Sequence, residues 1–339
     1  IGSLLEDGLG DTIRVSLTEE PEYEIPVATA LVKRYEKRST HKPIKPIKSN
    51  PLSPFEYKKR ATHTVLNIGG ENVPRVVTDL SLEKEISLDT LTLLGYKYFD
   101  LEDKWEISDS ACDYIFINQN TIDISFPGTL GVIQAYSVWM MERKEQHYPL
   151  FNLEQFLLEK SRHPQLNFLY MRLEDLNVEI IKKLKYNTCT VIIINTFNQH
   201  GMSEQRRIFM DFISSECSIP IIIGRSYKNL LTEIFQLYVA TDVGSLLIDG
   251  LGDGIFFSAE QCGSHKQVND AAFGILQASR TRISKTEYIS CPSCGRTLFD
   301  LQETTAMVRE QTSHLKGLKI GIMGCIVNGP GEMADADYG

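Results

Sequence analysis

The sequence predicts an α/β protein: a (β/α)8 TIM-type barrel followed by a small α/β domain. A 17-residue segment occurs twice along the chain, and short apolar strands alternate with amphipathic helices between its two copies. A separate pattern of one helix and one strand follows the second copy. Alternating strands and helices are typical of parallel α/β folds. A length of 339 residues suits about two domains.

The repeated segment indicates a duplication. Residues 1–17 read IGSLLEDGLGDTIRVSL and residues 243–259 read VGSLLIDGLGDGIFFSA, with 11 of 17 positions identical at an offset of 242. This offset is close to the roughly 250 residues of one barrel. The chain is therefore expected to open at the end of one barrel, within residues 1–35. Residues 62–275 are expected to form a second, inserted barrel.

Each copy predicts a short helix, a glycine turn and a strand, as at the last step of such a barrel. The helices are expected at Gly2–Leu5 and Gly244–Leu247, and the strands at Ile13–Leu17 and Ile255–Ala259. Between the copies, runs rich in β-branched and aromatic residues predict strands, and apolar residues at helical spacing predict helices. The strands are Arg75–Thr78, Tyr98–Leu101, Asp113–Asn118, Asn167–Met171, Thr190–Asn195, Ile219–Gly224 and Tyr238–Thr241; the helices are Leu153–Lys160, Asp175–Leu184 and Tyr227–Leu237.

Two further segments lie outside the predicted barrel. Lys33–Arg60 carries ten Lys or Arg against two Glu, with four prolines. This composition predicts an interdomain linker over residues 36–61, with a basic patch for nucleic acid or an acidic partner as the alternative. Residues 280–339 predict a small α/β domain, with a helix at Asp300–His314 and a strand at Leu318–Met323. The chain is expected to be cut at both ends.

Composition excludes several classes of protein. The chain has 35 Lys and Arg against 44 Asp and Glu, a net charge of -9, so no global positive field favours nucleic acid or an anionic membrane. The apolar runs are far shorter than the roughly 20 residues of a membrane helix. The chain starts at Ile1 without a recognisable leader. A soluble protein of about two domains is expected.

Seven cysteines, an odd number in a long chain, do not resemble a secreted disulfide framework and indicate a reducing compartment. Four stand alone in apolar or mixed surroundings and are predicted to be small buried apolar residues. These four are Cys112, Cys189, Cys217 and Cys262.

The other three cysteines form a constellation that can bind a metal. Cys291 and Cys294 form CPSC, and Cys325 lies in GIMGCIVNGPGE. Zinc requires a fourth Cys or His, and the nearby His314 is expected on the polar side of a helix. A four-iron cluster accepts three thiolates and leaves one corner for an oxygen ligand. A redox CxxC or incidental cysteines are the alternatives.

The residues after Cys325 favour a reactive site. The Gly-Pro-Gly of residues 329–331 predicts a tight turn that can return the carboxylate of Glu332 toward a metal at Cys325. A carboxylate is a hard ligand on a soft cluster and therefore exchangeable. Considered alone, Glu332 is alternatively interpreted as a solvated loop acid, and Asn328 as a residue that forms the turn.

Three motifs together resemble the 4-hydroxy-3-methylbut-2-enyl diphosphate synthases, iron–sulfur enzymes of the non-mevalonate isoprenoid (terpenoid) pathway. The motifs are GDTIRVSL at 10–17, CPSCGR at 291–296 and MGCIVNGPGE at 323–332. The resemblance covers residues 1–35 and 280–339. Residues 62–275 resemble the inserted domain of the three-domain form of plants and some bacteria.

The resemblance implies a reaction and a set of site residues. The enzyme would open 2-C-methyl-D-erythritol 2,4-cyclodiphosphate reductively with two electrons from ferredoxin or flavodoxin. By the same resemblance Cys291, Cys294, Cys325 and Glu332 would hold a 4Fe-4S cluster, with Glu332 also catalytic. Arg14 and Ser16 would bind the substrate diphosphate, and Asn328 the substrate beside the cluster. The implied location is the bacterial cytoplasm or, in a plant or alga, the plastid stroma.

The second copy of the repeat differs where the first would bind substrate. Thr12 and Arg14 of the first copy correspond to Gly254 and Phe256, so the charge is replaced by an apolar ring. The inserted barrel is therefore interpreted as a structural spacer, with a regulatory or partner-binding domain as the alternative. The first barrel would precede Ile1, so these 339 residues alone are expected to be inactive.

Two other functions stay open at this stage. One is a non-enzymatic iron–sulfur electron carrier or scaffold built on an inactive barrel, although a carrier has no need of the diphosphate contact expected from Arg14. The other is a zinc-stabilised binding module, which would be colourless.

Overall fold

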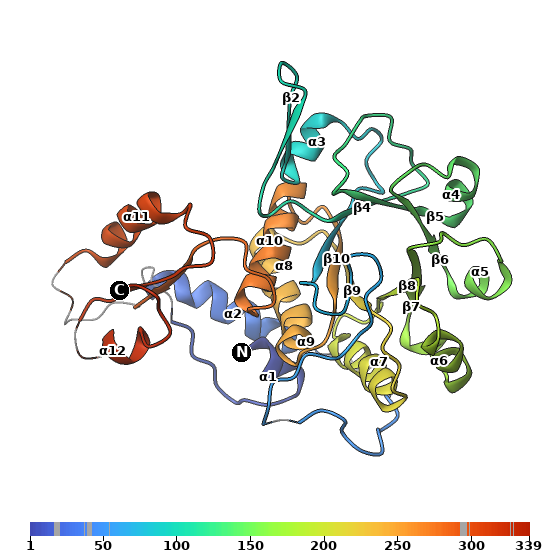
Figure 1. Ribbon diagram of the computed structural model, residues 1–339. Helices are drawn as coiled ribbons and strands as arrows, with labels where there is room; N and C mark the ends of the chain where they lie inside the picture. The colour runs from blue at the N-terminus through green and yellow to red at the C-terminus, as the bar shows by residue number, and fades with distance from the viewer. Residues whose placement is uncertain are drawn as a thin grey trace. The chain divides into compact units, whose positions relative to one another are not determined.

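The structure of the protein, a computed structural model, describes residues 1–16, 21–36, 38, 43–53, 55–291, 297, 299–325, 327 and 329–339. The chain forms two compact units. The barrel unit comprises Gly2–Asp7 and Ser39–Arg282, and the small unit comprises Ile1, Gly8–Arg38 and Ile283–Gly339. Each unit is described by itself, and its ribbon can be followed in Figure 1.

Eight parallel strands close into a barrel in the order β1-β10-β9-β8-β7-β6-β5-β4. This confirms the predicted TIM-type fold. Each pair of neighbouring strands in the barrel is parallel, as strand-helix-strand connections require. The strands are β1 (Arg75–Asp79), β4 (Tyr114–Asn118), β5 (Gly131–Ala135), β6 (His147–Phe151), β7 (Asn167–Met171), β8 (Thr190–Ile194), β9 (Ile221–Lys228) and β10 (Gly254–Glu260).

The barrel strands are buried on both faces, which explains their continuous apolar sequences. Strand β8 reads TVIII and is buried at every position. Alternate side chains fill the interior, where the rings of Tyr114 and Phe168 meet edge to face with centroids 5.6 Å apart. Val65 and Ile68, which precede β1, belong to the same inner cluster. The interior of this barrel is therefore a packed core.

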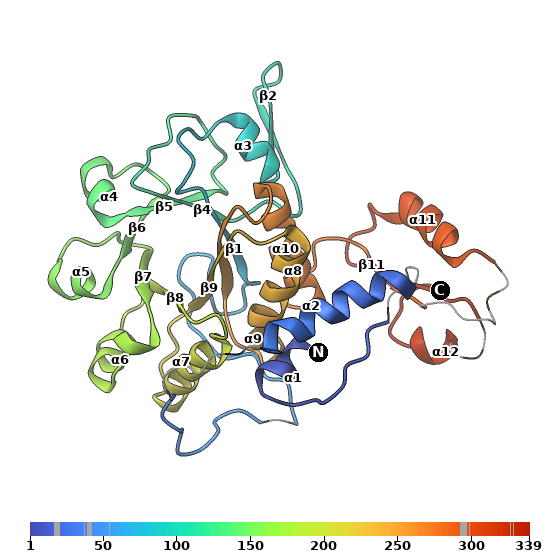
Figure 2. The same cartoon turned by 180° about the vertical axis from the view of Figure 1, so that it is seen from behind.

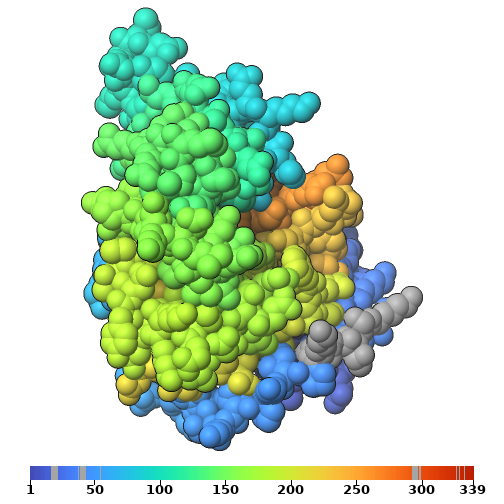
Figure 3. All heavy atoms as spheres, turned by 90° about the vertical axis from the view of Figure 1, so that its right-hand side faces the viewer, coloured from blue at the N-terminus to red at the C-terminus, as the bar shows by residue number. Residues whose placement is uncertain are grey.

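Helices cover the outside of the barrel, as the views from opposite sides show (Figures 1 and 2). Figure 3 shows the face that carries α4, α5 and α6. Apolar residues of the helices pack against the outward side chains of the strands in one large cluster. The helices of this unit are α1 (Gly2–Glu6), α3 (Leu88–Leu93), α4 (Tyr136–Glu142), α5 (Leu153–Leu158), η2 (Leu173–Asp175), α6 (Val178–Lys185), α7 (Met202–Ser214), α8 (Thr232–Val239), η3 (Ala240–Gly244), α9 (Ser245–Ile248) and α10 (His265–Ala278).

Several predicted elements are wrong. Tyr238–Thr241 is helical, because it continues the amphipathic face of α8 into η3. The strand predicted at Tyr98–Leu101 is confirmed only in part, as β2 (Tyr96–Phe99). It pairs antiparallel with β3 (Lys104–Ile107) in a hairpin outside the barrel. Residues 13–16 are irregular although a strand was predicted for Ile13–Leu17, and Leu17 lies outside the described residues. A strand needs a hydrogen-bonded neighbour, and sequence alone does not supply one.

The isolated cysteines of the barrel unit behave mostly as predicted. Cys112, Cys217 and Cys262 are buried, whereas Cys189 is half-buried. Burial raises the pKa of Cys112 to about 12 and also raises the pKa values of the Cys217 and Cys262 thiols. These three thiols therefore stay protonated at neutral pH and pack as small apolar groups.

The small unit is built around a parallel pair of strands. The predicted helix at Asp300–His314 is confirmed as α11, whose N-cap Asp300 accepts a hydrogen bond from the backbone of Glu303 at 2.9 Å. The predicted strand at Leu318–Met323 is confirmed as β12. The elements of this unit are η1 (Pro21–Tyr23), α2 (Glu24–Glu36), β11 (Glu287–Ser290), α11 (Leu301–Thr312), β12 (Lys319–Ile322) and α12 (Gly329–Glu332).

Within the described part of the chain, no helix combines the length and the apolar character needed to cross a bilayer.

Candidate functional site

Two of the predicted metal ligands follow neighbouring strands of the small unit. Cys291 directly follows β11, and its backbone N–H donates to the carbonyl oxygen of Ile322 at 3.2 Å. Because Ser290 pairs with Ile322, Cys291 leaves the sheet opposite Met323, two residues before Cys325. Parallel strands run side by side about 4.8 Å apart. The strand pairing therefore brings Cys291 and Cys325, 34 positions apart in the sequence, to one edge of the sheet.

A second contact joins the loops that follow the two strands. A Cβ atom added to Gly324 would lie 2.4 Å from the hydroxyl oxygen of Thr297, so this close approach requires glycine. Gly324 immediately precedes Cys325, and Thr297 immediately follows the CPSCGR motif. Both flanks of the segment that carries Cys294 thus contact β12 or the loop after it.

The surroundings of the two cysteines suit thiolate ligands of a metal centre. Cys291 is 7% exposed and packs with Leu301, Ile320 and Ile322. Cys325 is half-buried. Thiolates are the donors that zinc and iron–sulfur centres use. In the described ranges no group of three or more His, Cys, Asp or Glu is placed to hold a metal, and Cys294 lies outside those ranges.

The other predicted site residues are only partly described. Asn328 lies outside the described residues, and of Glu332 only the backbone is described, in α12. Arg14 and Ser16 are exposed and lie in the irregular segment after α1. They belong to the same compact unit as Cys291 and Cys325. An exposed guanidinium and hydroxyl are accessible to a phosphate group.

The equivalent position in the barrel unit is closed. Phe256 of β10 is 5% exposed and lies in the inner cluster of the barrel, where its ring meets that of Phe116 edge to face with centroids 5.5 Å apart. A phosphate group at this position would displace an aromatic contact and lose its water. The packing agrees with the loss of a binding function inferred from the change of arginine to phenylalanine.

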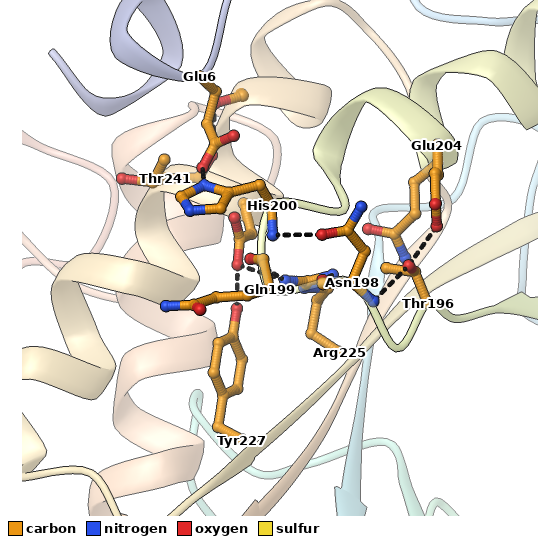
Figure 4. A network of polar contacts seen from close by, with 12 residues as sticks. Glu6, Thr196, Asn198, Gln199, His200, Glu204, Arg225, Tyr227 and Thr241 are labelled. Carbon is orange, nitrogen blue, oxygen red and sulfur yellow. Dashed lines mark hydrogen bonds and ion pairs between the residues drawn. The ribbon is translucent and has the colours of Figure 1, made fainter. Parts of the chain in front are cut away.

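The barrel unit contains a buried polar network that sequence analysis missed (Figure 4). Arg225 of β9 donates to a carboxylate oxygen of Asp242 at 2.8 Å, and the hydroxyl of Tyr227 donates to the same oxygen at 2.7 Å. The side chains of Arg225 and Asp242 are 3% and 0% exposed. Burial lowers the pKa of Arg225, but Asp242 and Tyr227 outweigh it and the pKa is raised.

The network connects strands, loops and helices. Arg225 also donates to the backbone carbonyls of Asn198 at 3.1 Å and Gln199 at 3.0 Å. The next residue, His200, lies 2.9 Å from a carboxylate oxygen of Glu6 in α1. The available signal was an arginine within an apolar strand, since β9 reads IIIGRSYK. Its hydrogen bonds join β9 to η3 and to the loop before α7, so the network holds the helical layer on the barrel.

The chain is similar to known proteins. Residues 287–339 match the family of the GcpE protein C-terminal domain. Over its whole length the chain is 41% identical to a 4-hydroxy-3-methylbut-2-en-1-yl diphosphate synthase (flavodoxin) of Parabacteroides distasonis and 42% identical to one of Phocaeicola vulgatus. It is 37% identical to one of Leptospira interrogans. The chain covers 52%, 52% and 54% of these proteins, about half the length of each.

Proposed function

We propose that the full-length protein is a 4-hydroxy-3-methylbut-2-en-1-yl diphosphate synthase, because the chain belongs to that family. It would reduce 2-C-methyl-D-erythritol 2,4-cyclodiphosphate with two electrons, open the ring and release water to give the linear allylic diphosphate. The observation that carries the proposal is the parallel pairing of β11 with β12, the two strands that Cys291 and Cys325 follow. That sheet lies inside the segment that matches the family domain.

In this proposal Cys291, Cys294, Cys325 and Glu332 hold a 4Fe-4S cluster. Support for Cys294 comes from the two flanks of its segment, which contact β12 and Gly324. When bound, the cluster supplies single electrons and a Lewis-acidic iron for the oxygen that leaves. The apolar neighbours Leu301 and Ile322 limit access of water on the protein side of Cys291.

The substrate contacts are assigned to Arg14, Ser16 and Asn328. The guanidinium of Arg14 can bind two phosphate oxygens at once, and the hydroxyl of Ser16 can donate one more hydrogen bond. Asn328 lies between Cys325 and Glu332 in the sequence, so its amide would orient a substrate oxygen near the metal. Support for the diphosphate contacts comes from the exposure of Arg14 and Ser16 and from their place in the unit that holds the cysteines.

We assign residues 1–35 to the end of a catalytic barrel, 36–61 to a linker, 62–275 to a structural barrel and 280–339 to the cluster domain. The packed interior around Phe256 supports a structural barrel. The linker would pass directly into that barrel, because the buried guanidinium of Arg60 donates to the carbonyls of Ile219 and Cys217 at 2.9 and 2.6 Å.

The electron donor proposed is flavodoxin, which appears in the names of the relatives. Ferredoxin is the alternative donor. The relatives named above are bacterial, and we propose a cytoplasmic enzyme that acts on a small molecule without binding nucleic acid or a membrane.

The proposal is tested with the full-length protein prepared without oxygen. We expect a brown protein with a broad visible absorption band, four irons per chain as in a 4Fe-4S cluster, and conversion of the cyclic diphosphate with reduced flavodoxin. A brown protein that leaves the cyclic diphosphate unchanged would instead be an iron–sulfur carrier or scaffold. A colourless protein containing zinc would disprove the cluster.

The variant Glu332→Ala distinguishes the role of the carboxylate from the role of the cysteines. The variant is expected to keep most of its iron and visible absorbance while turnover falls at least tenfold, because three thiolates hold the metal and an oxygen ligand is exchangeable. Iron content, absorbance and activity are measured on the same anaerobic preparation. The matched control is Glu310→Ala in α11, which should change neither iron content nor turnover. Full activity in Glu332→Ala would make Glu332 a solvated loop acid.

A further inference from the structure

A small cavity lies at the N-terminal end of the barrel. Its volume is about 220 Å³, and its wall includes Pro74, which directly precedes β1, and Gly252, which lies two residues before β10. Catalytic sites of TIM-type barrels lie at the opposite end, where the strands finish. A ligand in this cavity is therefore one that the barrel binds without converting it.

Three separate segments of the barrel unit form the wall of this cavity. Tyr57 and Lys59 belong to the segment that leads into the barrel, and residues 250–252 form the turn between α9 and β10. Arg280 follows the end of α10, two residues before the chain leaves the barrel unit. The cavity thus touches both the entry of the chain into the barrel and its exit.

The glycine turn holds the entering segment in place. The backbone N–H of Arg60 donates to the carbonyl oxygen of Gly250 at 2.8 Å, and a Cβ atom added to Gly250 would lie 2.4 Å from the carbonyl oxygen of Lys58. Gly250 also has a φ of +76°, which favours glycine. Lys59, between these two residues, therefore lies on a backbone that is fixed before any ligand binds.

The charged residues that line the cavity are cationic. They are Lys59 and Arg280, and among the described residues no Asp or Glu lines the cavity. Lys59 is half-buried, and its ammonium donates to the carbonyl oxygens of Gly70 at 2.8 Å and Asn72 at 3.0 Å. These contacts fix the position of the ammonium but leave its charge uncompensated. A cleft lined by charge of one sign concentrates ions of the opposite sign.

The residues around the cavity add further positive charge. Arg75 and Arg282 share the carboxylate of Asp113, at 3.0 and 2.5 Å. Arg282 also donates to the carbonyl oxygen of Pro74 in the cavity wall at 3.2 Å. Asp253, at the end of the glycine turn, is 3% exposed, and its carboxylate accepts hydrogen bonds from its own buried surroundings. Cations therefore outnumber carboxylates at this end of the barrel.

We propose that this cavity binds a phosphate ion. The guanidinium of Arg280 can bind two phosphate oxygens at once, and the third N–H of the Lys59 ammonium and the hydroxyl of Tyr57 can bind one each. The cavity is smaller than the roughly 300–1,000 Å³ of pockets for drug-sized ligands, which suits so small an anion. The bound ion would join the entering segment to the end of α10 and stiffen both. This inference goes beyond the proposed function and rests on the barrel unit alone.

The site is tested by brief acetylation of lysines in the full-length protein, with and without inorganic phosphate. Mass spectrometry compares Lys59 with Lys58, an exposed neighbour that does not line the cavity. At about ten times the Kd of phosphate, roughly one site in eleven stays open, so Lys59 should react about tenfold more slowly while Lys58 is unchanged. Sodium chloride of equal ionic strength should protect neither lysine. Equal acetylation of Lys59 throughout a phosphate titration would overturn the proposal.

Arg280→Gln should raise the Kd of phosphate about tenfold or more, because it removes a charged, two-pronged donor. The matched control is Arg143→Gln. Both arginines are exposed and follow a helix in the left-handed conformation, with φ of +56° at Arg280 and +46° at Arg143, so neither variant should unfold the barrel. Protection of Lys59 that is unchanged in Arg280→Gln, or that is lost in Arg143→Gln, would contradict the assigned site.

Hydrogen exchange gives a second readout that does not depend on lysine reactivity. Phosphate should slow the exchange of backbone amides in residues 57–60 and 280–282 of the parent protein but not of Arg280→Gln. Arg14→Ala, at the proposed substrate contact, should leave the protection of Lys59 intact. Loss of protection in Arg14→Ala would assign the phosphate to the substrate site and overturn the proposal.

None of these measurements depends on enzymatic activity. A colourless, inactive protein in which phosphate protects Lys59 would overturn the proposed function and leave the phosphate site standing. An active protein in which phosphate protects neither Lys59 nor the amides around it would do the reverse.

Discussion

Replacing Cys291 or Cys325 by serine in the full-length protein should remove most of its iron and visible absorbance and lower turnover at least a hundredfold. A serine hydroxyl is not deprotonated at neutral pH and is a harder ligand than a thiolate, so the cluster loses a corner ligand. Both cysteines leave one edge of the β11-β12 sheet, so we expect the two variants to behave alike. Iron content, absorbance and activity are measured together under anaerobic conditions.

The control for this experiment is Cys189→Ser. Cys189 is half-buried in the barrel unit and follows α6. This change removes a thiol without touching the proposed site, so iron content and turnover should stay within twofold of the parent protein. Retention of a complete, active cluster in either Cys291→Ser or Cys325→Ser would show that the thiolate in question is not a ligand.

Asp242→Ala should destabilise the barrel by about 3–5 kcal/mol, because it leaves the guanidinium of Arg225 buried without its counter-ion. The hydroxyl of Tyr227 loses its acceptor in the same variant. A loss of this size corresponds to roughly a hundred- to a few-thousand-fold faster hydrogen exchange in the most protected amides of β8 and β9, where exchange follows global opening. Hydrogen exchange is the measurement of choice here, because the unfolding of a multidomain protein is not two-state.

Two controls identify the cause of the lost stability in Asp242→Ala. Lys228 and Glu260 form an ion pair at 2.8 Å with side chains 62% and 36% exposed. Lys228→Ala should therefore change the opening free energy that hydrogen exchange reports for the barrel by less than about 1 kcal/mol. The double variant Arg225→Met with Asp242→Leu removes both buried charges and should be more stable than Asp242→Ala alone. Exchange in Asp242→Ala equal to that of the parent protein would contradict a supporting role for this pair.

The sequence by itself determined the barrel and marked the residues of a candidate cysteine site. The offset of 242 residues matched the length of a barrel, and runs such as TVIII in β8 carried strong strand signals because both faces are buried. The CPSC motif and Cys325 predict a metal site through spacing and chemistry alone, and this site stays a prediction. Strands β5 and β6 were missed, since GVIQA and HYPLF mix apolar residues with polar residues or proline.

Only the tertiary structure decided which distant residues meet. The pairing of Ser290 with Ile322 brings Cys291 and Cys325 to one edge, and no local pattern encodes that register. The ion pair of Arg225 with Asp242 and the contact of Ser3 with Ser245 likewise join elements far apart in the chain. Propensity and periodicity act over a few neighbouring residues, whereas burial and charge pairing are satisfied only when the elements pack. The irregular course of residues 13–16 has the same cause, because a strand forms only where another strand accepts its hydrogen bonds.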